Sequence, residues 1–278
     1  MVPRALRNWL RHPLESARWT MRDAAFRAGR TTTVRMRDDW TVRCHPASVD
    51  AFAVQRDQPE LAEELRTFIA HCSRDMVLVD IGAHFGLFTL AALRFSDGTA
   101  HVVAVDPSED AMRLFDANVE LAGGRARVEG VRAAVTRDGG TLSLLTTGAT
   151  AFHMMVPASA VRADAVVVSG VTLDSLVASR GLAPTHLKID VEGWEEAVLD
   201  GGQRVLRECR PMVFLELHGW MVRRAAGDPF GAFRVLAGCG YRRCEIGGRA
   251  IEPADAAAMD MARVVCFPEP PTSPPPHA

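Results

Sequence analysis

The chain has 278 residues, of which 48% are hydrophobic and 24% charged, the balance of an ordinary globular protein. Its 32 basic and 34 acidic side chains give a net charge of −2, so no overall field attracts nucleic acid. No apolar run reaches the roughly 18 residues of a membrane span, and the first thirty residues lack the apolar stretch of a signal peptide. These features exclude disordered, collagenous, integral-membrane and disulfide-scaffold proteins.

The cysteines indicate the cellular compartment and whether a zinc site is present, and the lysine content draws attention to one position. The six cysteines form no C-x-x-C pair and have no pair of histidines nearby, so we expect reduced thiols in a cytoplasmic protein and no zinc site. Among the 32 basic residues, Lys188 is the only lysine. Arg and Lys differ in shape and hydration, so this position indicates either a need for an ammonium group or a coding bias that spared one lysine.

Residues 1–57 are predicted to form an extension of a helix and a β-hairpin. Residues 1–30 hold seven arginines and only two acidic side chains, and apolar residues recur at helical spacing. We favour a helix that packs on the domain or on a partner subunit over one that lies on a membrane surface. Thr31–Met36 and Trp40–Cys44 are β-rich and separated by three charged residues, which is typical of a hairpin. The apolar residues of the helical pattern are Val2, Leu6, Trp9, Leu10 and Leu14.

Residues 58–267 alternate between strand and helix patterns. Pro59 opens a helical pattern, and short apolar runs then alternate with helical segments, which predicts an α/β fold with a doubly wound, mostly parallel sheet of seven strands. Strands are expected at Met76–Ile81, Ala100–Val105, Ala126–Val135, Thr185–Val191, Pro211–Leu217, Tyr241–Ile246 and Arg263–Phe267. Helices are expected at Gly86–Arg94, Ser108–Leu121, Glu195–Glu208 and Phe230–Ala237. Residues 268–278 form a proline-rich tail that we expect to be disordered.

The stretch between residues 136 and 170 has a weaker pattern. Thr141–Leu145 is expected to be a short strand and Thr146–Val156 a loop, and Ala165–Val171 is strand-like and leads into a short helix. We expect His153–Met155 to line an opening for substrate, although paired methionines also serve simply as packing.

The loop after the first parallel strand is a candidate cofactor site, because open parallel sheets bind ligands at the carboxyl ends of their strands. Gly82 lets the chain turn tightly, and Gly86 opens a helix whose free N–H groups favour an anionic group. Asp106 ends the second strand, where a carboxylate can accept hydrogen bonds from a ribose diol. These residues predict an adenosine-type cofactor, whereas the G-x-G-x-x-G motif of dinucleotide sites is absent. The alternative is a turn that needs its glycines for geometry alone.

Lys188, Asp190 and Glu192 lie around the end of a later strand. A carboxylate there can orient a substrate hydroxyl or act as its general base, and Lys188, on the same strand face as Asp190, would keep that residue ionised. We expect one of Asp190 and Glu192 to project into the cleft while the other turns aside or accepts from the next helix. The alternative is a structural ion pair.

Two histidines also lie at strand ends. His218 follows the fifth parallel strand with Glu216 on the same face, which suits a proton acceptor near neutral pH or a hydrogen-bonded structural histidine. His84, in the glycine loop, is expected to touch the tail of the cofactor or merely to fill the loop. No spacing of histidines and carboxylates resembles a metal triad, and G-x-S-x-G is absent, so we expect no metal and no serine nucleophile.

Six sequence blocks occur together in the order and spacing of a known family. They are D-I-G-A-H-F-G, V-D-P-S, T-L-D-S-L, L-K-I-D-V-E-G-W-E, V-L-D-G and P-M-V-F-L-E-L-H. Over residues 50–267 the chain resembles the FkbM-type S-adenosylmethionine-dependent methyltransferases, a branch of the Rossmann-like class I methyltransferase fold. Two positions depart from the family pattern: His84 stands where asparagine is common, and Trp194 stands where a small or aliphatic residue is usual.

The resemblance implies a set of site residues for S-adenosyl-L-methionine. The loop residues would surround its methionine moiety, Asp106 would hold the ribose hydroxyls, and two alanines would lie beside the adenine. Asp190 would lie near the sulfonium, and the proton acceptor would be Asp190 first, then His218, then Glu192. The loop residues are Asp80, Gly82, Ala83, His84 and Gly86, and the two alanines are Ala133 and Ala134.

The function implied by the resemblance is O-methylation of a hydroxyl on a sugar, glycolipid or secondary metabolite, with no metal and no nucleic-acid partner. One rival is an NAD(P)-dependent oxidoreductase, which shares the sheet and Asp106 but requires the missing glycine motif. A second rival is a catalytically silent methyltransferase-like binding module, against which the presence of Asp190 counts. The arginine-rich N-terminus leaves a peripheral membrane or subunit contact open, and the sequence gives no sign of which acceptor is used.

Overall fold

The computed structural model describes residues 13–146, 153–157 and 165–270. Its central sheet has the strand order β14-β13-β15-β12-β11-β3-β4-β5. The strands from β12 to β5 are parallel, and β15, β13 and β14 complete one edge in antiparallel pairing. The bounds are β3 Val77–Ile81, β4 His101–Val105, β5 Val128–Val131, β11 His186–Ile189, β12 Met212–Leu217, β13 Tyr241–Ile246, β14 Arg249–Ala250 and β15 Ala262–Pro268. The predicted doubly wound sheet is confirmed, and the two-residue β14 adds an eighth strand to the expected seven.

The order of the parallel strands reverses between β3 and β11, because the chain first builds outward through β4 and β5 and then returns to the other side of β3. Successive residues of β3 face opposite sides of the sheet: Leu78 belongs to one buried cluster, and Val79 and Ile81 belong to the other. Both faces are therefore covered, as the continuous apolar runs of the sequence predict. The reversal places the ligand-binding edge of the sheet at the ends of β3 and β11.

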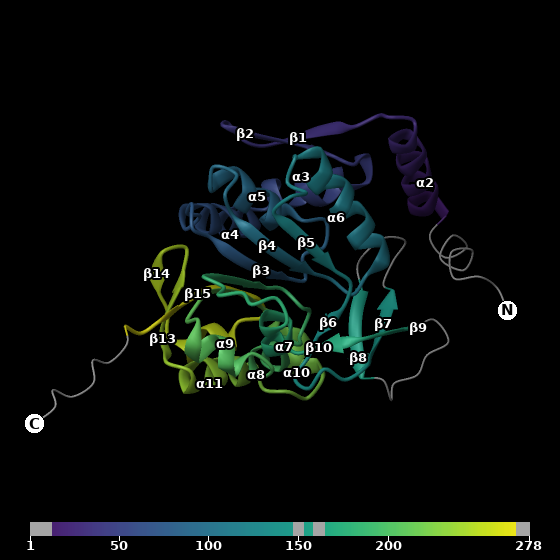
Figure 1. Cartoon of the computed structure of the whole chain (residues 1–278). Coiled ribbons are helices and arrows are strands. Elements are labelled where there is room, and N and C mark those ends of the chain that lie inside the picture. The colour runs from purple at the N-terminus through teal and green to yellow at the C-terminus, as the bar shows by residue number, and fades with distance from the viewer. Residues whose placement is uncertain (1–12, 147–152, 158–164, 271–278) are drawn as a thin grey trace, which may run out of the picture.

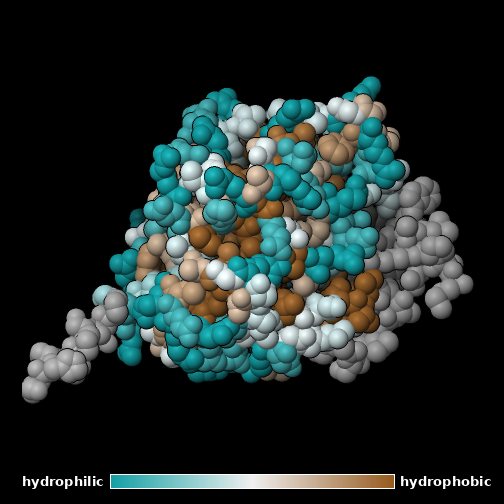
Figure 2. All heavy atoms as spheres, viewed as in Figure 1, coloured by the Kyte–Doolittle hydropathy of each residue, from teal (hydrophilic) through white to brown (hydrophobic). Residues whose placement is uncertain are grey.

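Helices pack on both faces of this sheet (Figure 1). One face carries α4 (Pro59–Ala70), α5 (Leu87–Phe95) and α6 (Glu109–Leu121), and the other carries α7 (Leu173–Ala178), α8 (Glu195–Asp200), α9 (Gln203–Glu208) and α11 (Phe230–Gly238). Two short helices, α10 (Gly219–Arg224) and α12 (Pro253–Ala258), complete the second half. Hydrophilic residues cover most of the face seen in Figure 2, with hydrophobic residues gathered near its middle. In the described residues, no helix combines the length and apolar character needed to cross a bilayer.

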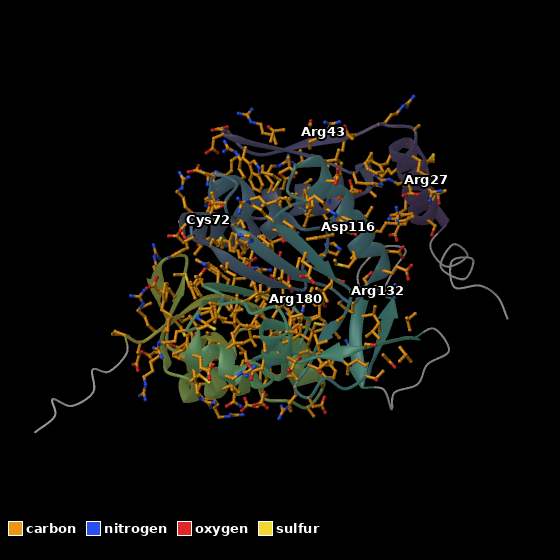
Figure 3. The ribbon with its side chains drawn as sticks, in the orientation of Figure 1. Arg27, Arg43, Cys72, Asp116, Arg132 and Arg180 are labelled. Carbon is orange, nitrogen blue, oxygen red and sulfur yellow. The ribbon has the colours of Figure 1, made fainter. Side chains whose placement is uncertain are left out.

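The N-terminal extension contains the predicted hairpin, β1 (Thr32–Arg37) and β2 (Trp40–Cys44), followed by the 3₁₀ turn η1 (Pro46–Ser48) and a helix α3 (Val49–Asp57) that the sequence reading missed. The helix before the hairpin, α2, is described over Pro13–Arg27, and the earlier part of the predicted amphipathic pattern lies outside the described residues. Charged side chains such as Arg27 and Arg43 point away from the body of the molecule (Figure 3).

The described part of α2 packs on its own domain. Asp23, only 4% exposed, pairs with Arg113 of α6 at 2.5 Å. The Arg113 guanidinium also lies 4.7 Å from the centre of the Trp19 ring. The hairpin shares a hydrophobic cluster with α4, α5 and α6, so the extension and the sheet are joined by a common core.

Several element boundaries differ from those expected. The predicted strand Ala126–Val135 ends as β5 at Val131 and continues as β6 (Ala134–Val135), which pairs with β10 (Gly170–Val171) in a separate sheet. Gly170 allows this pairing, because a Cβ there would lie 2.1 Å from the carbonyl oxygen of Gly140. The sequence pattern could not show this break, since β5 and β6 are both short and only two residues separate them.

The described residues of the weakly patterned stretch contain more strands than expected. The predicted strand Ala165–Val171 is two strands, β9 (Ala165–Val168) and β10, in different sheets. Part of the predicted loop forms β8 (His153–Pro157), which pairs with β7 (Leu142–Thr146) in a sheet of order β8-β7-β9. The side chains of His153, Met154 and Met155 lie outside the described residues, so their expected place at a substrate opening stays a prediction.

The predicted helix Glu195–Glu208 is interrupted at Gly201 and Gly202, giving α8 and α9. A Cβ on Gly201 would lie 2.3 Å from the carbonyl oxygen of Thr136. The close approach of this backbone therefore requires glycine and ends the first helix.

A single buried amide ties the extension to the glycine loop. The Asn118 side chain of α6 accepts from the backbone N–H of His45 at 2.8 Å and donates to Ser48 Oγ at 3.0 Å and to the carbonyl oxygen of Phe85 at 2.9 Å. Asn118 is 0% exposed, so water cannot replace these bonds. The amide fixes the position of the loop relative to both α6 and the extension.

We predict that Asn118→Ala lowers the free energy of unfolding by about 3 kcal/mol, because it leaves buried partners in two segments without a hydrogen bond. Glu120→Ala, on the exposed face of the same helix, should change it by less than about 0.5 kcal/mol. Urea denaturation followed by circular dichroism measures both. Equal effects of the two substitutions would show that the Asn118 amide does not hold these segments together.

Candidate functional site

The candidate site lies where β3, β11 and β12 end, as the sheet order predicts. A cavity of about 660 Å³ opens there, lined by residues of the glycine loop, of the strand ends and of the N-terminal helices α2 and α3. Asp190, Glu192, Glu216 and His218 line its inner part, and Arg18 and Arg22 of α2 also contribute. The extension thus forms part of the wall of the site, through α2 and α3.

The glycine loop is held against the end of β11. Gly82 has a φ of +81°, and a Cβ on it would lie 1.8 Å from the carbonyl oxygen of Asp190. The N–H groups of Gly82 and Ala83 both donate to the carbonyl oxygen of Val105, at 2.8 and 3.1 Å. Glycine is therefore required here for contact with Asp190 as well as for the turn, and the loop and Asp190 must move together.

The other residues expected in this loop differ in exposure. Gly86, with a φ of +86°, begins α5 and packs against the ring of Phe115. Asp80 is 1% exposed, and its Oδ2 accepts from Thr89 Oγ1 at 2.7 Å, so this carboxylate supports the loop from below. Burial raises the pKa of Asp80, against the effect of that hydrogen bond.

Asp106 holds the far end of the loop. Its Oδ2 accepts from the backbone N–H of His84 at 3.0 Å, and its Oδ1 accepts from the N–H of Ser108 at 2.8 Å. Burial raises the pKa of Asp106 to about 6 in spite of these bonds. His84 has a φ of +50° and stacks on the ring of Phe85 at 3.6 Å. Each carboxylate oxygen has further lone pairs, so Asp106 can both fix the loop and accept from a ligand.

The two alanines expected beside an adenine lie at the beginning of β6. Ala133 and Ala134 are 5% and 1% exposed, and the N–H of Ala134 donates to the carbonyl oxygen of Ser169 at 3.0 Å. Beyond the end of β4, Ser108 and Arg132 help to line a separate cavity of about 180 Å³. Ala133 and Ala134 belong to the hydrophobic core and line neither of these two cavities, so their expected place beside an adenine stays a prediction.

Lys188 lies at the centre of a buried charge network. Its Nζ is 2.9 Å from Glu64 Oε1, 3.7 Å from Glu216 Oε2 and 4.0 Å from Asp190 Oδ2. Burial alone would lower the pKa of Lys188, but the carboxylates of Glu64, Asp190 and Glu216 outweigh it and raise the pKa. Lys188 is 1% exposed and does not line the cavity, so it acts on the site through its neighbours.

Two members of this network were missed from the sequence. Arg263 of β15 lies 2.6 Å from Glu216 Oε1 and 3.3 Å from Glu64 Oε2. Glu64 lies on the apolar face of α4, between Leu61 and Leu65 in the helical pattern. A carboxylate on a face that otherwise packs against the core was the signal that could have marked Glu64 as part of a buried ion pair.

Asp190 and Glu192 both face the cavity, so the expectation that one of them turns aside is wrong. Glu192 has a φ of +55°, which directs the chain back toward the cavity after β11. Burial raises the pKa of Glu192. Burial and the nearby Glu216 raise the pKa of Asp190 well above its usual range and outweigh the opposite effect of Lys188, so the expectation that Lys188 keeps Asp190 ionised is wrong. The carboxylate that accepts a hydrogen bond beside the next helix belongs instead to Glu195, whose Oε1 accepts from the N–H of Gly193 at 2.9 Å.

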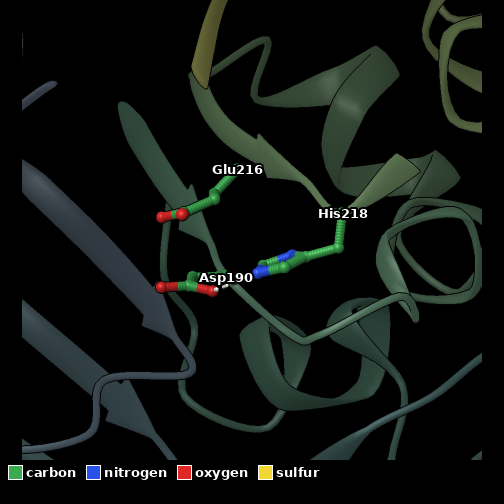
Figure 4. Close-up of side chains that lie close together, drawn as sticks. All are labelled: Asp190, Glu216 and His218. Atoms are coloured by element: carbon green, nitrogen blue, oxygen red, sulfur yellow. Dashed lines mark ion pairs between the residues drawn. The ribbon is translucent and has the colours of Figure 1, made fainter. Parts of the chain in front are cut away.

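His218 lies beside Asp190 at the end of β12, as Figure 4 shows. Its Nδ1 is 2.8 Å from Glu195 Oε1, and its Nε2 is 3.8 Å from Asp190 Oδ1. Burial would lower the pKa of His218, but the hydrogen bond to Glu195 and the charge of Asp190 raise it to about 9. The predicted neighbourhood of His218 and Glu216 is present, and Glu195 joins it as a residue that the sequence reading did not single out.

Asp190, Glu216 and His218 also form a group that was not visible in the sequence. One ligand atom from each lies within 4.8 Å of the others, a spacing that can hold a metal ion. The residues come from two strand ends far apart in the chain, so no short motif announced them. The Lys188 ammonium already places a positive charge next to both carboxylates.

The contact between the loop and Asp190 gives a direct test. Gly82→Ala should lower the free energy of unfolding by about 3 kcal/mol or more, because the new methyl group cannot fit against the carbonyl oxygen of Asp190. Gly98→Ala, with a φ of +72° and nothing within 4 Å of its Cβ, carries only the backbone strain of about 1 kcal/mol. Chemical denaturation of both variants measures the difference. Equal losses would mean that the loop does not press on Asp190.

One solved structure shares this fold and can be compared over nearly the whole chain. The Methyltransferase FkbM from Methylobacillus flagellatus KT is 14% identical, with a TM-score of 0.50 over 96% of this chain and 62% of that one. The chain thus spans less than two thirds of that protein. The O-methyltransferase from Bacillus cereus, solved in complex with SAH, is more distant in structure: it is 15% identical, with a TM-score of 0.44 over 80% of this chain and 88% of that one. No curated protein matches the chain.

The family model described as the methyltransferase FkbM domain matches residues 80–243, more than half of the chain. The matched range begins at Asp80, before the glycine loop, and includes Asp106, Lys188, Asp190 and His218. The glycine loop and the ends of β4, β11 and β12 therefore lie within the matched domain, on a sheet with the class I methyltransferase architecture, whereas Glu64, Arg263 and the helices α2 and α3 lie outside the matched range. The chain belongs to the FkbM methyltransferase family.

Proposed function

We propose that the protein is an S-adenosylmethionine-dependent methyltransferase that methylates a hydroxyl group, on a sugar, a glycolipid or a secondary metabolite. The observation that supports this most is the contact between Gly82 and Asp190. It joins a loop suited to an adenosine cofactor directly to a cluster of proton acceptors at the wall of a cavity. Cofactor binding and acceptor deprotonation would then take place at neighbouring groups.

The residues present fit this cofactor. When bound, S-adenosylmethionine supplies a methyl group on a positively charged sulfur. The cluster at the cavity holds more carboxylates than cations, so it favours a cationic group over a neutral one. Asp106 keeps lone pairs for a ribose diol, and the glycine loop offers bare backbone for the amino-acid end. The carboxylates are Glu64, Asp190, Glu192, Glu195 and Glu216, and the cations are Lys188 and Arg263.

The chain's own residues would orient the acceptor and take its proton. A hydroxyl is a poor nucleophile while protonated, so a base must lie within hydrogen-bond reach of it. Asp190 Oδ1 and His218 Nε2, 3.8 Å apart, form such a pair at the cavity, with Glu192 as a third acceptor. Holding the hydroxyl in line with the reacting methyl group would supply a further large part of the rate enhancement.

The charge of the cavity supports a hydroxyl over a carboxylate as the group that is methylated. Asp190, Glu192 and Glu216 line its inner part, and they would repel an anionic acceptor. The cations Arg18 and Arg22 lie on α2. Both pair with Asp50 of α3, at 3.7 and 2.7 Å. The part of the cavity wall that α2 forms is therefore polar and already paired, which suits a neutral polar acceptor.

Separate variants should distinguish cofactor binding from turnover. Asp106→Ala should weaken the binding of S-adenosylhomocysteine about 10- to 100-fold, because it removes an ionic hydrogen-bond acceptor. Asp190→Asn should leave that affinity within about threefold and lower turnover about 100-fold or more, because it removes a proton acceptor. Isothermal titration calorimetry and transfer of a radiolabelled methyl group to glycan and metabolite extracts measure the two effects.

Titration of the unmodified protein with NADH tests the alternative that the protein is an NAD(P)-dependent oxidoreductase. Binding of NADH without binding of S-adenosylhomocysteine would contradict the proposed function. Full turnover in Asp190→Asn would remove Asp190 from the mechanism while leaving the cofactor assignment intact.

A substitution in the part of the cavity wall formed by α2 should affect the binding of the acceptor and not that of the cofactor. Arg22, held to Asp50 by hydrogen bonds of 2.7 and 3.1 Å, lines the cavity. We expect Arg22→Ala to raise the KM of the acceptor about 5-fold, in line with the loss of about one hydrogen bond, and to leave cofactor affinity unchanged. Arg27→Ala, on the same helix with a side chain 77% exposed, should change neither. A weaker cofactor affinity in Arg22→Ala would contradict this prediction, because it would show that α2 contributes to binding of the cofactor and not of the acceptor alone.

A further inference from the structure

Glu195 is a buried carboxylate at the beginning of α8. It is 0% exposed, and its Oε1 lies 2.9 Å from the N–H of Gly193 and 2.8 Å from His218 Nδ1. Among the described residues it has no arginine or lysine as an ion-pair partner, which sets it apart from Glu64 and Glu216. A carboxylate taken out of water in this way is costly unless its partner carries or gains a positive charge. The ionisable partner present is His218.

The local backbone is bent to bring Glu195 to this place. Glu192 and Gly193 both have positive φ values, +55° and +94°. For a residue other than glycine, that conformation costs free energy and is found most often at functional sites. The turn returns the chain toward β12, so that α8 begins beside His218. Glu195, the first residue of α8, accepts from the N–H of Gly193 in this turn and so holds the turn against the helix.

The bond to Glu195 decides which nitrogen of His218 faces the site. An ionised carboxylate accepts only, so Nδ1 carries a hydrogen and donates it to Glu195. Nε2 is then the nitrogen that gains or loses a proton, and it lies 3.8 Å from Asp190 Oδ1. That separation is too long for a direct hydrogen bond. His218 lines the cavity, so a hydroxyl group placed there can reach both atoms.

We propose that Glu195 is a positioning residue for His218: it fixes the Nδ1–H tautomer and stabilises the imidazolium that forms when Nε2 takes the proton of the acceptor hydroxyl. This inference rests on the proposed function for its substrate. The proton moves from the hydroxyl oxygen to Nε2, and the positive charge that the imidazole gains is balanced by Glu195 across the ring. Glu195 itself does not line the cavity and acts only through His218.

The charges around the imidazole determine the effect of removing Glu195. The groups that face His218 are Glu195 of α8, Asp190 and Glu192 after β11, and Glu216 of β12, all of which favour the imidazolium. Loss of the Glu195 charge removes the one that is hydrogen-bonded to the ring. With a pKa of about 9, His218 is mostly an imidazolium at neutral pH, and the neutral imidazole that can take a proton prevails above that pH. Removal of the Glu195 charge should lower the pKa of His218 and move the acid limb of the rate profile to lower pH. The same change makes Nε2 a weaker base, so turnover is compared on the alkaline plateau of both profiles, above the acid limb.

The test compares Glu195→Gln with wild type by NMR titration of histidine labelled with ¹⁵N. The amide oxygen of glutamine can still accept from Nδ1, so the substitution removes the charge and keeps the shape. We expect His218 to titrate about one pH unit or more lower in the variant, with Nε2 still the nitrogen that titrates. Where an acceptor is in hand, kcat should fall about 10-fold or more with the acid limb shifted and KM little changed.

Glu196→Gln is the matched control, because Glu196 follows on the same helix with a side chain 42% exposed and 3.9 Å from Arg137. It should leave the His218 titration unchanged. Glu195→Asp keeps the charge on a shorter side chain, should titrate between wild type and Glu195→Gln, and serves as the test if the glutamine variant does not fold.

An unchanged His218 titration in a folded Glu195→Gln or Glu195→Asp protein would overturn the proposal. Loss of activity without a shift of the titration or of the pH profile would do so too, because it would show a structural role alone. The titration requires neither cofactor nor acceptor. A failure of the proposed methyl transfer would appear separately, as absence of S-adenosylhomocysteine binding in the wild-type protein.

Discussion

The burial of the Lys188 ammonium among carboxylates is the constraint on which the site depends. It gathers Glu64 from α4, Glu216 from β12 and Asp190 from the end of β11 around one charge. A buried ammonium and buried carboxylates are each costly alone, so the arrangement is stable only when all of them are present. This requirement fixes Asp190 next to the glycine loop, and through Gly82 it fixes the loop as well. The side chain that holds the site together is thus one that no ligand touches.

Much of the fold follows from the sequence, because strands buried on both faces must be apolar throughout. The runs that became β3, β4, β11 and β12 could be read in that way, and their ends located the site. The sequence reading failed where short strands depend on distant partners. The pairing of β6 with β10 depends on Gly170 lying against Gly140, a contact between segments that no local pattern connects. The break between α8 and α9 likewise depends on the distant backbone of Thr136.

The sequence predicted where the site lies in the fold, but it did not predict which buried side chains contact one another there. Asp106, Asp190 and His218 stand at strand ends, where parallel sheets place functional groups, and the structure finds them there. Glu195 was hidden, because an acidic residue in the first turn of a helix is ordinary and nothing local shows that its carboxylate turns inward to His218. Arg263 was hidden because it belongs to β15, an antiparallel strand that comes late in the chain and inserts between β12 and β13.

The central claim is that the crevice beside the ends of β3 and β4 binds the adenosine and amino-acid ends of S-adenosylmethionine, with its sulfur toward Asp190. The most direct measurement is a crystal structure of the protein grown with S-adenosylhomocysteine. We predict that the ribose hydroxyls lie within hydrogen-bond distance of Asp106 and that the amino-acid end lies over the loop at Gly82. A crevice that stays empty at saturating ligand, or a ligand bound elsewhere on the molecule, would contradict the account.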